Sequence, residues 1–291
     1  MFDQILRHTS AYGDIYELKK NVHRITVLNY EIMPLILPLE IKSKKAFCKF
    51  MPGENLENIN LEISKDDLMF QFWLHHSGTI DNALEDYFSS GYKQAVIIND
   101  ILKSNFTDIA NINILDFASG HGRISRYFKL FLPIANITIA EIKLGAVDFQ
   151  KNIFGYEGFV SFPNPAQLTS DEKFDYILVS SLFTHLNKEL FSLWLGKLGS
   201  MLTDHGILSL SLHIDNSIEK MIFNYSEKSE EDMFIETSGN IAGLNIYGLT
   251  YLNNIQFIQL VVANLGINYK IIDERPWGES QVLMSIQKKQ N

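Results

Sequence analysis

The stretch INILDFASGHGR, residues 112–123, predicts a short buried strand, a tight glycine turn and a helix that begins near His121. A strand that runs into a glycine turn points backbone N–H groups outward, where a ligand can accept their hydrogen bonds. Gly120 and Gly122 let that ligand approach the main chain, because glycine has no Cβ. Glu141 ends the next apolar run, where a carboxylate accepts hydrogen bonds from a ribose diol. The pattern therefore predicts a site for a nucleoside cofactor.

The glycine turn is compatible with more than one nucleoside. A dinucleotide site requires G-x-G-x-x-G/A, and here the third small position holds Ser125, followed by Arg126. Asp116 lies ahead of the first glycine, where a carboxylate crowds a pyrophosphate but suits a ligand with an amino group. The pattern D-x-x-x-G-x-G resembles motif I of the class I S-adenosylmethionine (SAM)-dependent methyltransferases more than a dehydrogenase motif. An NAD-dependent oxidoreductase and a non-catalytic cofactor-binding protein with the methyltransferase fold are the alternatives.

The resemblance continues in the family's order from about residue 80 to the end of the chain. The run FDYILVSSLFTHL, residues 174–186, resembles the family's fourth strand and the loop after it. The run DHGILSLSL, residues 204–212, resembles the fifth strand, and residues 269–273 and 281–286 resemble the terminal hairpin. The resemblance implies an α/β fold, a Rossmann-like seven-stranded methyltransferase sheet with an antiparallel C-terminal hairpin.

The first part of the chain, residues 1–75, does not share the resemblance. We predict a small β-rich N-terminal module there, because short apolar runs alternate with Pro-, Gly- and Lys-containing turn signals. It serves either as a structural or dimerisation element or as an acceptor-recognition module. The strand-like runs are residues 24–28, 36–41, 46–50 and 59–63.

The methyltransferase domain is expected over residues 76–291. Helix-like runs at 80–88 and 92–102, broken by Ser89-Ser90-Gly91, precede alternating strands and helices, which favour a parallel sheet covered by helices. A polar stretch interrupts this alternation and predicts an insertion or lid at about residues 214–251.

Composition limits the partners. The formal net charge is −9, from 34 acidic and 25 basic residues, and argues against nucleic acid, because phosphate binding normally needs a basic face. The single cysteine, Cys48, cannot form an intrachain disulfide and fits a reducing compartment. We see no signal peptide and no membrane span in the sequence, so we expect a cytoplasmic protein with a small-molecule or sugar acceptor. The sequence leaves the oligomeric state open.

The resemblance implies roles for residues that follow the strands. Asp116 helps to position the amino-acid part of SAM, and Glu141 binds the ribose hydroxyls. No acidic residue stands at residues 164–167, directly after the third strand, which leaves adenine recognition to backbone amides or to Gln167. Tyr87 and Gly91, in the preceding helices, are expected to close over the cofactor. The predicted cofactor-binding residues are Asp116, Ala118, Ser119, Gly120, Gly122, Glu141, Asn164, Pro165, Gln167, Ser180, Ser181, Leu182, Tyr87 and Gly91.

The predicted general base is His185, because histidine accepts a proton from a hydroxyl or ammonium group near neutral pH. The alternative is a polar residue that packs beside Phe183. His213, at the end of the fifth strand, is the second catalytic candidate, and the spacing of His, Asp and Glu fits no metal site.

A polar and aromatic cluster in the hairpin suggests an acceptor surface, since a flat indole beside carboxylates commonly binds sugars. The predicted acceptor-binding residues are Tyr247, Tyr251, Glu274, Trp277 and Gln281. We therefore expect an O- or N-methyltransferase that acts on a sugar, a glycan or another small molecule. The resemblance points to a surface-glycan or secondary-metabolite pathway.

Overall fold

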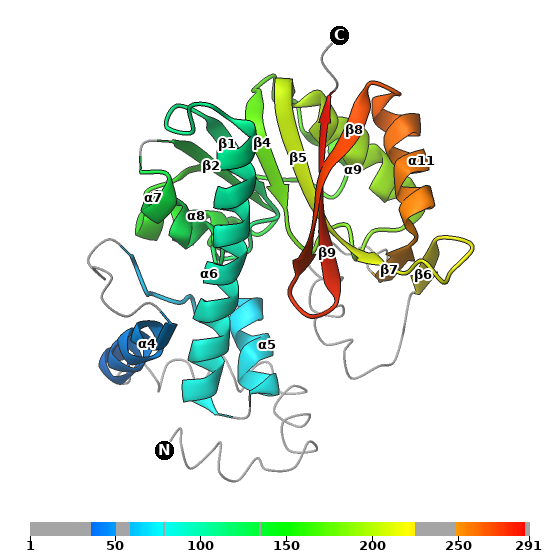
Figure 1. Ribbon diagram of the computed structural model, residues 1–291. Coiled ribbons are helices and arrows are strands. Elements are labelled where there is room, and N and C mark those ends of the chain that lie inside the picture. The colour runs from blue at the N-terminus through cyan, green and yellow to red at the C-terminus, as the bar shows by residue number, and fades with distance from the viewer. Residues whose placement is uncertain (1–35, 51–58, 78, 134, 225–247, 289–291) are drawn as a thin grey trace. The chain divides into compact units, whose positions relative to one another are not determined.

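The computed structural model describes residues 36–50, 59–77, 79–133, 135–224 and 248–288 (Figure 1). The chain divides into two compact units, Met1–Lys93 and Gln94–Asn291. The division falls inside helix α6 (Ile80–Asn105), whereas the sequence pattern changes near residue 75. In the described part of the chain, no helix has the length and apolar character that crossing a bilayer requires.

The first unit is helical where the sequence predicted strands. Residues 36–41 and 46–50 both lie in α4 (Ile36–Phe50), so these two strand predictions are wrong. The physical reason is the spacing of the buried side chains: Ser43, Ala46 and Phe47 are buried, which is a helical period. Residues 59–63 form no strand among the described residues, and residues 24–28 lie outside them.

Helix α6 is continuous through the predicted break at residues 89–91. The hydroxyls of Ser89 and Ser90 donate to the backbone carbonyls of Asp86 and Tyr87, at 3.5 and 3.1 Å. Bonded to the preceding turn in this way, the two serines do not end the helix. The prediction of two helices is therefore wrong.

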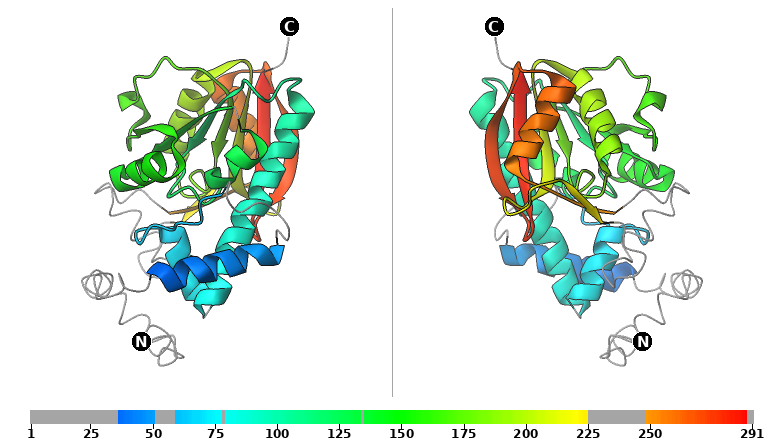
Figure 2. Two further views of the ribbon diagram at one scale, coloured as in Figure 1. Left: turned by 90° about the vertical axis from the view of Figure 1, so that its left-hand side faces the viewer. Right: turned by 90° about the vertical axis from the view of Figure 1, so that its right-hand side faces the viewer.

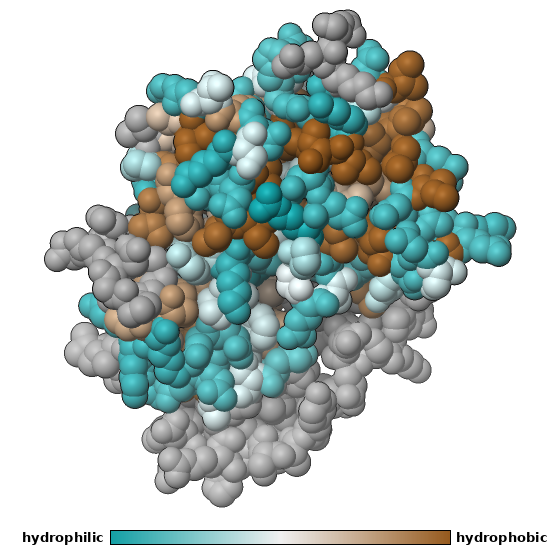
Figure 3. Space-filling model, in the orientation of Figure 1, coloured by the Kyte–Doolittle hydropathy of each residue, from teal (hydrophilic) through white to brown (hydrophobic). Residues whose placement is uncertain are grey.

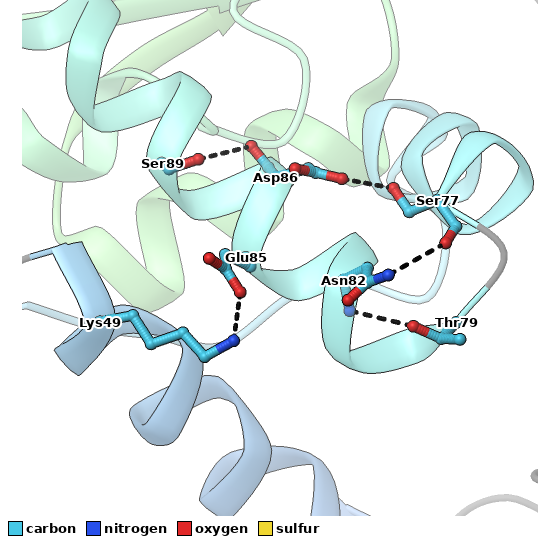
Figure 4. A network of polar contacts seen from close by, with 7 residues as sticks. All are labelled: Lys49, Ser77, Thr79, Asn82, Glu85, Asp86 and Ser89. Atoms are coloured by element: carbon cyan, nitrogen blue, oxygen red, sulfur yellow. Dashed lines mark hydrogen bonds and ion pairs between the residues drawn. The ribbon is translucent and has the colours of Figure 1, made fainter.

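Polar contacts hold the helices of this unit together (Figure 4). Lys49 of α4 pairs with Glu85 of α6, and the Ser77 hydroxyl donates to the carboxylate of Asp86 at 2.6 Å. Ser77 follows α5 (Leu68–His76), so the three helices are linked within the unit.

The second unit contains a nine-stranded sheet. Seven of its strands follow the order β3-β2-β1-β4-β5-β9-β8, in which β9 runs antiparallel to both of its neighbours. The seven-stranded sheet with an antiparallel C-terminal hairpin is thus confirmed. The strands are β1 (Asn113–Phe117), β2 (Asn136–Glu141), β3 (Glu157–Val160), β4 (Phe174–Val179), β5 (Leu202–Ile214), β8 (Tyr269–Trp277) and β9 (Gln281–Lys288).

The two remaining strands extend the carboxyl end of β5. β7 (Leu249–Leu252) pairs with β5 in parallel, and β6 (Ile222–Asn224) pairs with β7. They are the described part of the predicted insertion, of which residues 225–247 lie outside the described structure.

Helices cover both faces of this sheet. The part of α6 within the second unit lies on one face, and α9 (Lys188–Ser200) and α11 (Asn254–Leu265) lie on the other (Figure 2). Helix α8 (Leu144–Phe154), as predicted, joins β2 to β3. Strands β1 and β4 are buried almost throughout, which accounts for their largely apolar sequences.

The prediction that a helix begins near His121 is wrong. A turn through residues 121–124 is followed by the 3₁₀ segment η3 (Ser125–Tyr127) and the single-turn helix α7 (Phe128–Phe131). Gly122 has φ +78°, a left-handed conformation that a right-handed helix cannot contain, so the helical geometry starts only after it.

One surface of the second unit is apolar. Ile255, Ile258 and Val262 of α11 are exposed at helical spacing, and the apolar surface along α11 is visible in Figure 3. The opposite side of the same helix is buried, through Phe257, Leu260 and Val261.

Candidate functional site

The candidate site lies at the carboxyl ends of β1 and β4, where the strand order reverses. The chain moves from β1 outward to β2 and β3, and then returns to place β4 on the other side of β1. Open α/β sheets bind ligands at this switch point. The residue that follows β1, Ala118, has φ +59°, and Ser181, two residues after β4, has φ +63°. These are the two non-glycine residues with positive φ in the described structure, and such strain gathers at functional sites.

The glycine loop, which we define as residues 118–122, is joined to the end of β2. The backbone N–H of Gly120 donates to Glu141 Oε2 at 2.9 Å. The other oxygen, Oε1, accepts from the N–H groups of Ile142 and Lys143, at 2.8 and 3.3 Å. Glu141 is only 8% exposed, so a single buried carboxylate connects the tips of β1 and β2.

The two glycines of the loop have different surroundings. A Cβ on Gly122 would lie 2.5 Å from the Phe154 ring and 2.9 Å from Gln150 Oε1, so packing against α8 requires glycine there. A Cβ on Gly120 would meet nothing within 4 Å, although its φ of +57° also favours glycine. The main chain is therefore open at Gly120, as the approach of a ligand requires.

Asp116 is buried near the end of β1, with 2% of its surface exposed. Burial raises its pKa to about 7, opposed by a hydrogen bond with Ser125, while the nearby Glu141 raises it further and Arg123 lowers it. This carboxyl group therefore gains or loses its proton near neutral pH.

The residues predicted after β3 lie on the surface, with one exception. Asn164 and Gln167 are exposed, and Pro165 is buried at the start of the 3₁₀ segment η4 (Pro165–Gln167). Asn164 caps this segment, its Oδ1 accepting from Ala166 N–H at 3.0 Å. Sequence analysis missed Phe162, which is 39% exposed directly after β3.

The tip of β4 is bonded to β5 and to the hairpin through the predicted serines. The Trp277 indole donates to Ser180 Oγ at 3.0 Å, and the Ser181 hydroxyl donates to Gln281 Oε1 at 3.3 Å. The Ser181 backbone N–H donates to Ser211 Oγ at 2.6 Å. The structure therefore brings together Ser180, Ser181, Trp277 and Gln281, and adds Ser211, which the sequence did not distinguish from its neighbours in β5.

Trp277 does not present the exposed indole that was expected. It is 2% exposed, because Pro276 and Trp277 belong to β8 and only residues 278–280 form the turn. The hairpin therefore does not present the flat indole surface that the sequence predicted for sugar binding. Glu274 is exposed on β8 opposite Met284 and takes no part in the hydrogen bonds at the β4 tip.

His185 is buried in the loop after β4, with 7% of its surface exposed. Its Nδ1 lies 2.9 Å from the Gly248 carbonyl oxygen. A carbonyl only accepts, so Nδ1 carries the hydrogen and Nε2 of the neutral ring keeps its lone pair. Burial lowers the pKa of His185 to about 4, opposed by the bond to Gly248 and assisted by the nearby His213. The ring is therefore neutral at pH 7.

His213 and Tyr251 lie beside each other on β5 and β7. Their rings stack with centroids 4.9 Å apart, and their backbones are paired in register. His213 is 8% exposed and influences the pKa of His185, so the two predicted catalytic histidines lie in one region. Tyr247, another predicted acceptor-binding residue, lies outside the described residues.

Leu182, of the cofactor set, is half-buried in the loop after β4 and packs against the core of the second unit. Tyr87 and Gly91 belong to the first unit. There the Tyr87 hydroxyl donates to Asp67 at 2.5 Å, and its ring contacts Phe70 edge-on at 5.5 Å. The structure thus gives Tyr87 a packing role within its own unit.

A missed residue of the site is Gln150, which is fully buried in α8. Its amide bonds to Ser119, Gly120 and Ser125. The sequence held a signal for it: Gln150 is the polar member of an otherwise apolar helix face, with Ala146, Val147 and Phe154.

Comparison with known proteins finds solved structures of similar fold. No family model matches the chain, and no curated protein matches it in sequence. The fold is similar to that of 1,6-didemethyltoxoflavin-N1-methyltransferase from Burkholderia thailandensis, which was solved with 1,6-didemethyltoxoflavin and S-adenosylhomocysteine. The TM-score is 0.50 and the sequence identity is 12%, over 70% of this chain and 80% of that chain. Magnesium protoporphyrin IX methyltransferase from Synechocystis PCC 6803, with bound S-adenosylhomocysteine, has a TM-score of 0.47 and 14% identity, over 71% of this chain and 87% of that chain. The second unit thus has the class I methyltransferase fold.

Proposed function

We propose that the protein is a SAM-dependent methyltransferase that transfers a methyl group to an oxygen or nitrogen atom of a small molecule. The observation that carries this proposal is the pairing of an open glycine loop with the Glu141 carboxylate at the switch point of a methyltransferase-type sheet. The Burkholderia and Synechocystis enzymes of similar fold were solved with the product of SAM, which supports the same cofactor here.

The residues at the strand tips fit the chemistry of this cofactor. Glu141 offers a carboxylate to a ribose diol, and a carboxylate at this position disfavours a 2′-phosphate. Asp116 offers a second carboxyl group for the ammonium of the methionine part. The exposed side chains of Leu144, at the start of α8, and Phe162, two residues after β3, offer apolar surface for adenine. When bound, SAM supplies a methyl group that its sulfonium has already activated.

We assign the proton-accepting role to His185. Its Nδ1–H is held by Gly248, so Nε2 is the ring nitrogen that would accept a proton from an acceptor hydroxyl or amine. His213, whose ring stacks on Tyr251, is the second group of this region. Because methyl transfer mainly requires alignment and the removal of one proton, no metal is needed in this proposal.

A sugar, glycan or secondary metabolite is the acceptor class that we propose, with Tyr251 and Gln281 as contact residues. Both lie beside the histidines or the β4 tip. A screen of hydroxylated sugars and aromatic small molecules with labelled SAM tests this assignment. If neither the sugars nor the aromatic molecules are methylated, the proposed acceptor class is rejected. The cofactor assignment is tested separately, by binding.

The cofactor assignment is tested by titrating the full chain with S-adenosylhomocysteine and with NAD in a calorimeter. We expect heat of binding with S-adenosylhomocysteine and none with NAD. Binding of NAD alone would instead support the oxidoreductase alternative.

Gly120→Ala tests where the cofactor lies. The added methyl group enters the open side of the loop, so we expect the affinity for S-adenosylhomocysteine to fall at least about tenfold, the equivalent of 1.4 kcal/mol. Gly155→Ala is the matched control, since Gly155 has φ +65° and therefore similar backbone strain. Gly155 follows the C-terminal end of α8, toward the opposite edge of the sheet, so its variant should bind normally. Equal affinities of the two variants would contradict the placement.

A further inference from the structure

We propose that Gln150 is a positioning residue that sets the shape of the glycine loop for cofactor binding, an inference that rests on the proposed function. Gln150 is fully buried in α8, and both ends of its amide are bonded to residues 119–125. Two of these contacts are with the glycine loop itself, and the third is with Ser125 beyond it.

The nitrogen of the amide holds the loop itself. Nε2 donates to Ser119 Oγ at 2.7 Å and to the Gly120 carbonyl oxygen at 2.9 Å, which uses both of its hydrogens. A carbonyl accepts but cannot donate, so the nitrogen must face Gly120, and this fixes the orientation of the amide. The bond to the Gly120 carbonyl restrains the residue whose N–H donates to Glu141.

The oxygen of the amide holds the segment that follows the loop. Oε1 accepts from the Ser125 hydroxyl at 2.9 Å, and Ser125 also contacts the carboxyl group of Asp116. Gln150 thereby connects the loop to the end of β1. The loop requires a donor at Gly120 and an acceptor at Ser125, and among side chains of this length only glutamine supplies both.

The helix that carries Gln150 is itself firmly placed. Helix α8 packs on β2 and β3, and the Phe154 carbonyl near its end accepts from Lys129 Nζ at 2.7 Å. Phe154 also fills the space that a Cβ on Gly122 would need. The left-handed residues of the loop therefore keep their conformation because a rigid helix holds them through Gln150 and Phe154.

Two substitutions test the proposal. Gln150→Met keeps the length of the side chain and removes the hydrogen bonds, while Gln150→Glu keeps an acceptor for Ser125 and places a second oxygen against the Gly120 carbonyl. We expect either change to raise the dissociation constant of S-adenosylhomocysteine about tenfold, because two or three buried hydrogen bonds are lost or replaced by repulsion.

Val147→Ala is the matched control, because Val147 is buried in the same helix and has no hydrogen-bonding side chain. It should lower the melting temperature and leave the dissociation constant within about twofold of the wild type. If Gln150→Met does not fold, Ser119→Ala removes one of the bonds from the loop side, with an expected rise of about threefold.

Hydrogen exchange of residues 118–122 is the second readout, and it does not require a ligand. Exchange should become faster in Gln150→Met and stay at the wild-type rate in Val147→Ala. Wild-type exchange in Gln150→Met would overturn the proposal. Failure of the wild-type chain to bind S-adenosylhomocysteine would instead reject the proposed function, and hydrogen exchange would still decide what Gln150 does.

Discussion

At the scale of single residues, Asp116 is a group whose charge the fold controls strongly. Burial raises its pKa to about 7, so a large share of the carboxyl groups carry a proton at neutral pH. A ligand with an ammonium group favours the ionised form, and binding must then release this proton. The affinity for the cofactor should therefore depend on pH.

We predict that the affinity for S-adenosylhomocysteine falls as the pH drops below 7, by up to about tenfold per pH unit, because the proton on Asp116 opposes binding. Asp116→Asn should bind more weakly at pH 7 and show a flatter profile between pH 5 and 7. The exposed Asp108 gives the control, since Asp108→Asn should keep the wild-type profile. Calorimetry across this range decides, and a flat wild-type profile would contradict the role of Asp116.

The sequence predicted the glycines, Asp116 and Glu141 of this site, because their residue types carry the chemistry. It did not predict the left-handed Ala118 and Ser181, since nothing in an alanine or a serine signals a positive φ. Their conformations are imposed by bonds from elsewhere in the chain, such as that from Ser181 N–H to Ser211.

At the scale of secondary-structure elements, the β8–β9 hairpin is attached to the tip of β4 by the bond from Trp277 to Ser180. We predict that Trp277→Phe lowers the free energy of unfolding, and that a double-mutant cycle with Ser180→Ala gives a coupling of about 1 kcal/mol, the net value of one buried hydrogen bond. Urea unfolding of the four proteins measures it.

Trp194→Phe is the control for this cycle, because it removes the same ring volume from the core around α9. It should be additive with Ser180→Ala. Additivity in the Trp277 cycle as well would mean that the bond does not hold the hairpin.

The sequence predicted the elements of the sheet better than those of the N-terminal unit. Apolar strands such as β1 and β4 are buried on both faces, so their sequence pattern follows directly from their position. In α4, the run of lysines at residues 44–45 resembles a turn, although it is the exposed face of a helix. The helix α11 was missed because its exposed side is also apolar, which hides its periodicity.

At the scale of the whole molecule, the buried His185 makes stability depend on pH. The unfolded chain binds a proton on this histidine near its ordinary pKa of 6.5, whereas the folded chain does so only near 4. Between these values the unfolded state holds more protons. The stability that the neutral, buried His185 contributes is therefore fully present above pH 6.5 and is lost as the pH falls toward 4.

We predict that, between pH 7 and 4.5, the wild type loses about 2 kcal/mol more unfolding free energy than His185→Gln, which does not titrate. Glutamine can still donate to Gly248. His205→Gln, at an exposed histidine, should behave as the wild type. Urea unfolding at the two pH values decides, and identical losses in all three proteins would show that His185 does not titrate as its burial implies.

The absence of a side chain at Gly122 makes the residue at position 122 dependent on those at positions 150 and 154. Any substitution there must be accompanied by a smaller residue at 150 and at 154, because a methyl group would occupy their space. We therefore expect substitutions at these three positions to occur together in evolution. In an alignment of homologous sequences the three positions should covary. A lineage with alanine at 122, glutamine at 150 and phenylalanine at 154 would need a different path for the main chain.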